Sequence, residues 1–175
     1  EQQDLGKTMK WGLPTSAYHA DMPKAVGKYW AGKTIVHMEL QPMDSTAADN
    51  ANWKAVMNKY GNKSDARDTF SQAGYLSAKV ATQALLGIKG TIDRKAVHDA
   101  FKGVRNFRSD IMCGPWYFGP GERHQPNHAG RAAELTATGF KTIAECYQSK
   151  DAELADVLDF EAKNADVELA DLRNI

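Results

Sequence analysis

The chain has 175 residues, which is enough for one globular domain with a single sizeable core. Its 22 Lys and Arg residues balance 22 Asp and Glu residues, so it lacks the basic field that non-specific nucleic-acid binding requires. Because its apolar runs are short and broken by Gly or charge, we expect no membrane-spanning helix.

The first forty residues predict a strand, a helix and a second strand. The first strand is expected at 7–13 and ends at Pro14, and Thr15 or Ser16 is expected to cap a helix over 17–29. β-branched residues then predict a strand over 34–40. This order is typical of a parallel α/β sheet.

Residues 43–108 predict three helices in succession. Apolar residues at helical spacing indicate a first helix, with Asp49 or Asn50 as its cap and Gly61 as its end. A longer helix is expected to begin near Phe70, and Asp93 is expected to cap the third. Three helices without a strand between them cannot form a sheet of their own, so we expect them to pack on another body.

The region after Met112 returns to strand-like patterns. The aromatic run 116–118 is interpreted as a half-buried strand that fills a core, with a stacking platform for a ligand ring as the alternative. A loop follows over 119–130, and strands at 131–136 and 141–146 are predicted to form a hairpin. The acidic stretch 151–175 is interpreted as a surface helix.

No strong catalytic motif is present. The sequence lacks a dinucleotide-binding glycine motif, a phosphate-binding loop, a nucleophile elbow and a zinc-protease motif. His124 and His128 are four residues apart and are the best candidate metal ligands, but they lie in a Pro-containing loop rather than on one helix face. A loop that shapes a turn is favoured over a metal site, and no cofactor is expected.

The two cysteines, Cys113 and Cys146, are far apart in the sequence and form no Cys-x-x-Cys motif. Their residue chemistry leaves two alternatives open. Either both are small buried apolar residues in a reducing compartment, or they form one structural disulfide in an oxidising compartment.

The ordered series of local features resembles a known family. Leu13-Pro14-Thr15 precedes a helix, Phe70-Ser71-Gln72-Ala73-Gly74-Tyr75 leads into an Ala-rich helix, and Thr91-Ile92-Asp93-Arg94-Lys95-Ala96-Val97 begins the next. A Gly-Pro return strand follows over 114–118. Over residues 8–148 the chain resembles the C-terminal half of type I periplasmic solute-binding proteins of ABC importers, of the branched-chain amino-acid-binding-like family.

This resemblance implies an α/β fold of two parallel-sheet lobes joined by a hinge, of which this chain forms only the C-terminal half. Residues 1–43 and 109–150 would belong to the C-terminal lobe, 44–108 would be helices packing on an absent N-terminal lobe, and 151–175 would be an acidic C-terminal helix or tail. The implied protein is not an enzyme. It would be a periplasmic receptor, made with a signal peptide that is later removed.

The implied function is capture of a small organic solute in the cleft between lobes and its delivery to an ABC importer permease. The solute would be an aromatic or aliphatic carboxylic acid or an amino-acid-like compound. Two alternatives are a ligand-sensing domain of a signalling protein and a metal-dependent enzyme using His124 and His128. A disulfide between Cys113 and Cys146 is favoured in this context, and it would stabilise the fold by roughly 3–4 kcal/mol.

The resemblance also implies ligand-binding residues. Thr15 occupies a position where amino-acid-binding members carry a carboxylate for the ligand ammonium, and a hydroxyl cannot neutralise that charge. Phe70 matches an aromatic residue that packs on the ligand, although it could equally be the first core residue of its helix. Their sequence neighbours Ser16, Tyr18 and Gln72 complete the expected set.

Overall fold

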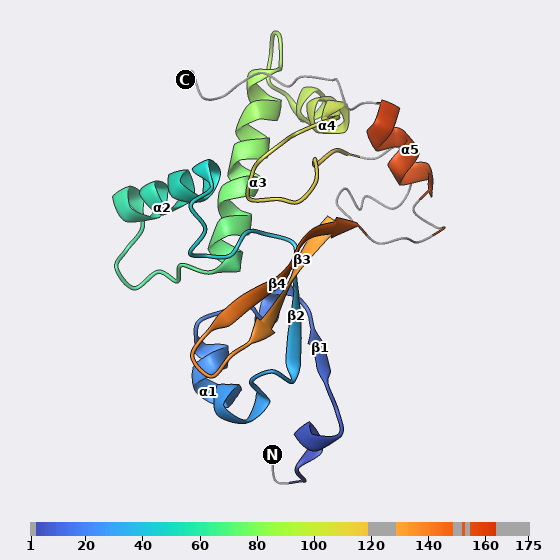
Figure 1. Ribbon diagram of the computed structural model, residues 1–175. Helices are drawn as coiled ribbons and strands as arrows, with labels where there is room; N and C mark the ends of the chain where they lie inside the picture. Colours follow the sequence, from blue (N-terminus) through green and yellow to red (C-terminus); the bar gives the residue numbers. More distant parts are fainter. Residues whose placement is uncertain (1–2, 119–128, 149–151, 153–154, 164–175) are drawn as a thin grey trace. The chain divides into compact units, whose positions relative to one another are not determined.

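The computed structural model describes residues 3–118, 129–148, 152 and 155–163. The chain divides into two compact units (Figure 1). Unit 1 comprises Glu1–Ala73, Asp110–Cys113 and Ala129–Gln148. Unit 2 comprises Gly74–Ser109, Gly114–His128 and Ser149–Ile175. Each unit is therefore built from chain segments that are distant in the sequence.

Unit 1 contains a four-stranded sheet in the order β1-β2-β3-β4. β1 (Trp11–Leu13) pairs in parallel with β2 (Thr34–Met38), as the strand–helix–strand pattern predicts. β3 (Ala129–Leu135) pairs antiparallel with both β2 and β4 (Phe140–Gln148), and β3 and β4 form the predicted hairpin. The sheet is mixed, with one parallel pair and two antiparallel pairs.

The connection between β1 and β2 differs in part from the prediction. A short 3-10 helix, η1 (Leu5–Lys7), precedes β1, and a second, η2 (Thr15–Ala17), follows it. α1 begins only at Asp21 and ends at Trp30, and its N-cap is Ala20 without a side-chain bond. The expected capping by Thr15 or Ser16 is therefore wrong, because the turn after η2 delays the helix start.

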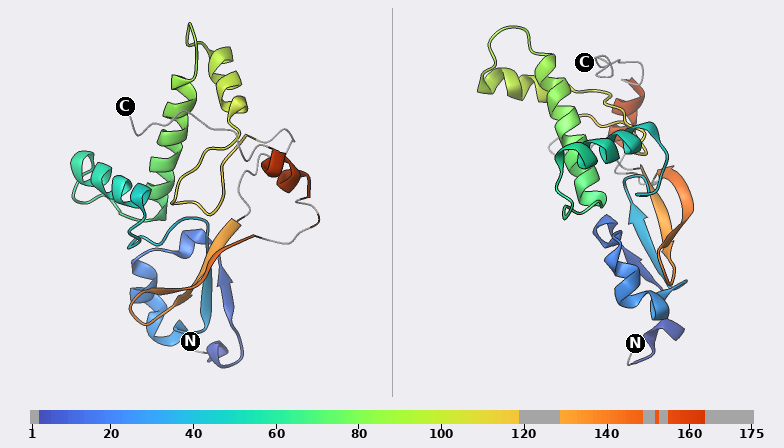
Figure 2. Two further views of the ribbon diagram at one scale, coloured as in Figure 1. Left: turned by 45° about the horizontal axis from the view of Figure 1, so that its top comes forward. Right: turned by 90° about the vertical axis from the view of Figure 1, so that its left-hand side faces the viewer.

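The core of unit 1 lies on one face of the sheet. Its members are the buried residues Tyr18, Val36, Met38 and Ala133, against which Leu13, Ala17, Met43 and Phe140 pack. α1 lies along the sheet (Figure 2). Gly27 of α1 approaches the β3–β4 turn so closely that a Cβ atom would lie 2.9 Å from the carbonyl oxygens of Thr136 and Ala137. The absence of a side chain at Gly27 allows the helix and the turn to pack.

Two helices follow in unit 1. α2 (Ala48–Tyr60) has Ala47 as its N-cap, so the expected capping by Asp49 or Asn50 is wrong. Asn50 lies within the helix, and its side chain donates 2.8 Å to the carbonyl oxygen of Ser45 in the preceding loop. α3 (Thr69–Leu86) is preceded by Asp68, which exchanges two 3.0 Å hydrogen bonds with Ser71 in the pattern of a capping box.

Unit 2 contains the remainder of α3 from Gly74 onward and α4 (Arg94–Gly103). Asp93 caps α4 by accepting a bond from the Ala96 amide, as predicted. The two helices border an apolar groove of about 210 Å³, lined by Val80, Gln83, Ala84, Gly87, Ala100, Gly103, Val104 and Phe107. In the described part of the chain, no helix is long and apolar enough to span a membrane.

The expected strand over 116–118 is wrong. Trp116 forms an isolated antiparallel bridge to Phe107, and the Phe118 amide donates 3.1 Å to the Val104 carbonyl, but no strand forms over 116–118. Tyr117 is buried and lies 5.0 Å, between ring centroids, from Phe160 of α5 (Ala155–Lys163). α5 confirms the helix predicted within 151–175 for the residues that it spans. Of the other residues in that segment, the structure describes only position 152.

Candidate functional site

Three of the expected ligand-binding residues follow the carboxyl end of β1. Thr15 and Ser16 lie in η2, directly after Pro14, and Tyr18 ends that turn. The Thr15 hydroxyl donates 3.3 Å to the carbonyl oxygen of His37 near the end of β2. Ligands of α/β proteins commonly bind at the carboxyl ends of parallel strands. Thr15 is half-buried and Ser16 is exposed, so both side chains retain accessible surface.

Tyr18 is placed differently from its neighbours. Its side chain is buried in the core, with its ring centroid 4.5 Å from that of Phe140. Burial raises the pKa of Tyr18 to about 12, and the nearby negative charge of Asp44 acts in the same direction. The phenol is therefore neutral at physiological pH, and it contributes to the site chiefly by fixing the turn that carries Thr15.

The other two expected residues lie in the first turn of α3. Phe70 is 65% exposed, whereas Gln72 has no exposed surface. The Gln72 amide nitrogen donates 2.6 Å to Asn50 Oδ1 and 3.2 Å to the carbonyl oxygen of Gln41. Its Oε1 has no hydrogen-bond partner among the described residues. Phe70 is thus accessible to a ligand, while both hydrogens of the Gln72 amide have protein acceptors.

One segment of unit 1 links these two groups of residues. Met43, in the loop after β2, packs against the cluster that contains Tyr18. In the same loop, the Gln41 carbonyl accepts the hydrogen bond from Gln72, and the Ser45 carbonyl accepts one from Asn50. The structure therefore holds the turn at Thr15 and the start of α3 against a common loop, residues 41–45.

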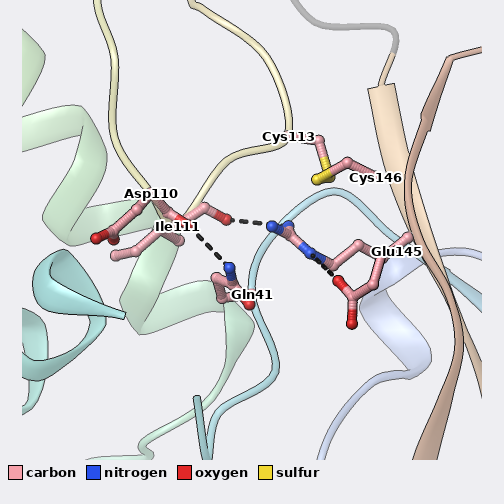
Figure 3. The surroundings of a disulfide bond; sticks show 7 residues. Gln41, Asp110, Ile111, Cys113, Glu145 and Cys146 are labelled. Carbon is pink, nitrogen blue, oxygen red and sulfur yellow. Dashed lines mark hydrogen bonds and ion pairs between the residues drawn. A yellow bond between two sulfur atoms is a disulfide. The ribbon is translucent and has the colours of Figure 1, made fainter. Parts of the chain in front are cut away.

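The sequence reasoning missed Arg131 on β3. It is 3% exposed, its Nη1 donates 3.4 Å to the carbonyl oxygen of Ile111, and its Nε lies 3.4 Å from Oε2 of the exposed Glu145 (Figure 3). The contact with Glu145 is an ion pair without hydrogen-bond geometry. Burial lowers the pKa of the guanidinium, and Glu145 opposes that effect. The available signal was an arginine that shares its alternation in the strand with the apolar residues Ala133 and Leu135.

Cys113 and Cys146 form a disulfide within unit 1, with their Cα atoms 5.2 Å apart (Figure 3). This confirms the pairing that the family resemblance favoured. Cys113 is half-buried and Cys146 is exposed. The bond therefore joins β4 to the short segment Asp110–Cys113, which returns to unit 1 from unit 2.

Within the described ranges, no group of three or more His, Cys, Asp or Glu side chains is placed to hold a metal ion. His124 and His128, the candidate metal ligands, fall outside those ranges.

The family model for periplasmic binding proteins matches residues 1–140. This chain belongs to the periplasmic binding protein family. The match spans four of every five residues, including β1, β2 and β3 of unit 1 and the helices of both units up to α4. The family's type I fold accounts for a chain that contributes to two units and returns to the first.

Solved structures share this fold. A branched-chain amino-acid ABC transporter protein from Thermus thermophilus, solved with bound valine, matches with a TM-score of 0.68 and 19% identity over 85% of this chain and 41% of its own. A fatty-acid ABC transporter substrate-binding protein from Thermomonospora curvata matches with a TM-score of 0.60 and 15% identity over 79% and 36%.

A substrate-binding protein of an ABC transporter from Aeropyrum pernix has a TM-score of 0.68, with 11% identity over 87% of this chain and 41% of its own. No curated protein matches the chain. The chain spans about two fifths of the length of these solved structures.

Proposed function

We propose that this chain forms part of an extracytoplasmic receptor that captures a small organic solute and delivers it to the membrane permease of an ABC importer. Membership of the periplasmic binding protein family over residues 1–140 supports this function. The observation that carries the assignment of the site is the position of Thr15, in a turn at the carboxyl ends of two parallel strands and bonded to the His37 carbonyl.

The candidate site favours a solute without a buried ammonium group. Thr15, Ser16 and Phe70 present accessible surface, and none of them carries a charge. The Thr15 proton is directed at the His37 carbonyl, so its hydroxyl offers lone pairs to a ligand donor such as an amide N–H. A hydroxyl cannot neutralise an ammonium, and a buried ammonium without a counter-charge is strongly unfavourable.

Phe70 supplies the apolar part of the proposed wall. Its ring is 65% exposed although it belongs to the first turn of a packed helix. An accessible aromatic face suits an aliphatic chain or an aromatic ring of the solute. We therefore favour aromatic or aliphatic carboxylic acids and amides over α-amino acids, with the carboxylate bound by groups of another lobe.

Gln72 and Tyr18 are assigned supporting roles in this site. Gln72 has no exposed surface, and Tyr18 is 6% exposed. The Gln72 amide holds the loop at Gln41, and Tyr18 packs beneath the turn that carries Thr15. These residues would fix the geometry of the wall without touching the solute.

The proposal includes a second lobe from the rest of the protein. The apolar groove between α3 and α4 and the exposed Leu86 and Ile92 are suited to pack against that lobe. The expectation that helices in 44–108 cover an N-terminal lobe remains part of this proposal. The share of the solved structures that this chain spans, about 41%, is consistent with it.

A ligand screen on the full-length protein tests the function. Thermal unfolding would be measured with aromatic acids, short and long aliphatic acids, their amides and the α-amino acids. We expect stabilisation by members of the first three classes, because a ligand that binds only the folded state raises its stability. Stabilisation by α-amino acids alone would contradict the proposal that the site at Thr15 disfavours a ligand ammonium group. If no solute stabilised the protein, the receptor function would be contradicted.

A further inference from the structure

The loop between Phe107 and Trp116 joins the two units twice within a few residues. Its base is in unit 2, where the backbones of Phe107 and Trp116 exchange hydrogen bonds of 2.9 and 2.7 Å. Its tip, Asp110–Cys113, belongs to unit 1 and bridges to Leu40 through Met112. Only residues 108–109 lead out to the tip and only 114–115 lead back. We call residues 108–115 the finger.

Hydrogen bonds hold the amino end of the tip. The Gln41 amide donates 2.7 Å to the Ile111 carbonyl, and the Gln41 side chain donates 3.0 Å to the Asp110 carbonyl. The Asp49 amide donates 3.0 Å to Asp110 Oδ1. Arg131 adds its longer bond to the Ile111 carbonyl. Asp110 and Ile111 are therefore fixed to unit 1 without help from the cysteines.

The disulfide holds the carboxyl end of the tip, and a β-bulge provides its partner. Between the pairs Gly130↔Tyr147 and Ala132↔Ala144, β3 advances by two residues while β4 advances by three. Glu145 and Cys146 thus both oppose Arg131 on β3. One of the two bulge residues forms the ion pair with Arg131, and the other forms the covalent bond to Cys113.

We propose that this disulfide, which we call the staple, is a reducible cross-link that sets how many residues of the finger are free to move. In the oxidised protein, the return to unit 2 begins at Gly114, so the free chain on the return side is Gly114 and Pro115. In the reduced protein, the nearest fixed points of the tip are the Met112 bridge and the bonds of Ile111. The staple is accessible, because Cys146 is exposed and Cys113 is half-buried.

The chemistry needs an external dithiol, such as the active-site pair of a thiol–disulfide oxidoreductase. Its thiolate attacks one sulfur of the Cys113–Cys146 bond and forms a mixed disulfide, releasing the other cysteine as a thiolate that takes up a proton. The second thiol of the reagent then displaces the remaining cysteine. Two electrons pass to the protein, which gains two thiols, and the reagent becomes a disulfide.

The consequence for ligand binding rests on the proposed receptor function. A receptor that closes on its solute bends where the chain passes between its units. A longer free segment gives the open form more conformations, which must be lost on closure, so preorganisation falls. We expect the reduced receptor to bind its solute about 3- to 10-fold more weakly than the oxidised receptor.

Amide hydrogen exchange of the full-length protein tests the staple, comparing oxidised protein, protein reduced with dithiothreitol, and the Cys113→Ser/Cys146→Ser variant. We expect exchange at residues 113 and 114 to rise at least about tenfold on reduction and in the variant, with little change in β2 and α1. Dithiothreitol should have no effect on the variant. The reduced wild-type protein provides the comparison if the variant does not fold.

Unchanged exchange at residues 113 and 114 would overturn the proposal, and so would an equal rise throughout the sheet, which would make the disulfide a general stabilising bond. Solute affinity measured in the same samples separates the two proposals. A local rise in exchange in a protein that binds no solute would support the staple and contradict the receptor function. Equal affinity in both redox states would overturn the link between the staple and binding.

Discussion

Gln72 and Asn50 share a 2.6 Å hydrogen bond between α3 and α2, and neither side chain has any exposed surface. Asn50 in turn donates to the Ser45 carbonyl, and Gln72 donates to the Gln41 carbonyl. Because buried polar groups are costly to leave unpaired, this pair fixes the loop 41–45 more firmly than exposed hydrogen bonds would. That loop contacts both halves of the candidate site.

Replacing Gln72 should therefore destabilise the protein. Gln72→Leu leaves Asn50 Oδ1 and the Gln41 carbonyl without their donor, and we expect the free energy of unfolding to fall by about 1–3 kcal/mol. Denaturant unfolding provides the measurement. Thr82→Ala, which removes an exposed hydrogen bond on the same helix, is the control and should change stability by less than about 0.5 kcal/mol. Equal losses of stability in the two variants would show that the buried pair stabilises the protein no more than an exposed hydrogen bond does.

Two helical glycines should respond in opposite directions to alanine. At Gly27 the new Cβ would lie 2.9 Å from two backbone oxygens, whereas at Gly74 nothing lies within 4 Å. We expect Gly27→Ala to cost about 1–3 kcal/mol through overpacking. Gly74→Ala should stabilise by about 0.5–1 kcal/mol, because alanine is the better helix former. Their denaturation midpoints, compared with that of the native sequence, test this pair, and a stabilising Gly27→Ala would contradict the close packing of α1.

The raised pKa of Tyr18 predicts a loss of folding stability in strong alkali. Below pH about 10 the phenol is neutral in both states and contributes no pH dependence. Between pH 10 and about 12 it ionises in the unfolded chain but not in the folded one, so stability falls as pH rises. The loss should approach about 2–3 kcal/mol by pH 12.

Unfolding free energies measured across this range, together with the absorbance of tyrosinate, check the effect. Tyr18→Phe is the matched control because it keeps the ring in the core and removes the ionising group. The variant should lose less stability between pH 10 and 12 than the native sequence does. An identical decline in both proteins would refute the assignment to Tyr18.

Alanine substitutions at Phe70 and Tyr60 distinguish an aromatic ring that contacts the ligand from one that is only exposed. Phe70 is 65% exposed and Tyr60 is 73% exposed, so alanine at either position should alter stability by less than about 0.5 kcal/mol. Under the proposed function, Phe70→Ala should weaken solute binding about tenfold or more, while Tyr60→Ala should leave it unchanged. Isothermal titration of both variants in the full-length protein provides the comparison. Equal affinities would remove Phe70 from the site.

The periodic segments were predictable from the sequence because their burial follows from local patterns. The helix capped by Asp93 and the hairpin of β3 and β4 were confirmed. Failures occurred where a contact outside the segment's own residue pattern decides the structure. The aromatic run 116–118 has a composition typical of a strand, but it forms only an isolated bridge, between Trp116 and Phe107. Asn50 has the chemistry of a helix cap, yet its amide serves loop carbonyls from inside α2.

In the candidate site, too, the local helix was predictable from the sequence, whereas the burial of individual side chains was not. Phe70 and Gln72 are two residues apart, which places them about 200° apart around a helix. The pattern predicted the helix, but only the structure shows that Gln72 faces the interior and Phe70 does not. Arg131 was missed because the acceptor for its buried guanidinium is the carbonyl of Ile111, twenty residues earlier in the chain. The disulfide needed the family context, since its residue chemistry left two alternatives open.

The pairing of β2 with β3 has a consequence for how the chain folds. Met38 and Arg131 are register partners although 93 positions separate them in the sequence (131 − 38). The β3–β4 hairpin and the β1–β2 unit can form from neighbouring residues, but joining them closes a loop that contains most of unit 2. Such distant pairings are slow. We therefore expect the central strand contact of the sheet to form last, after the helices it encloses.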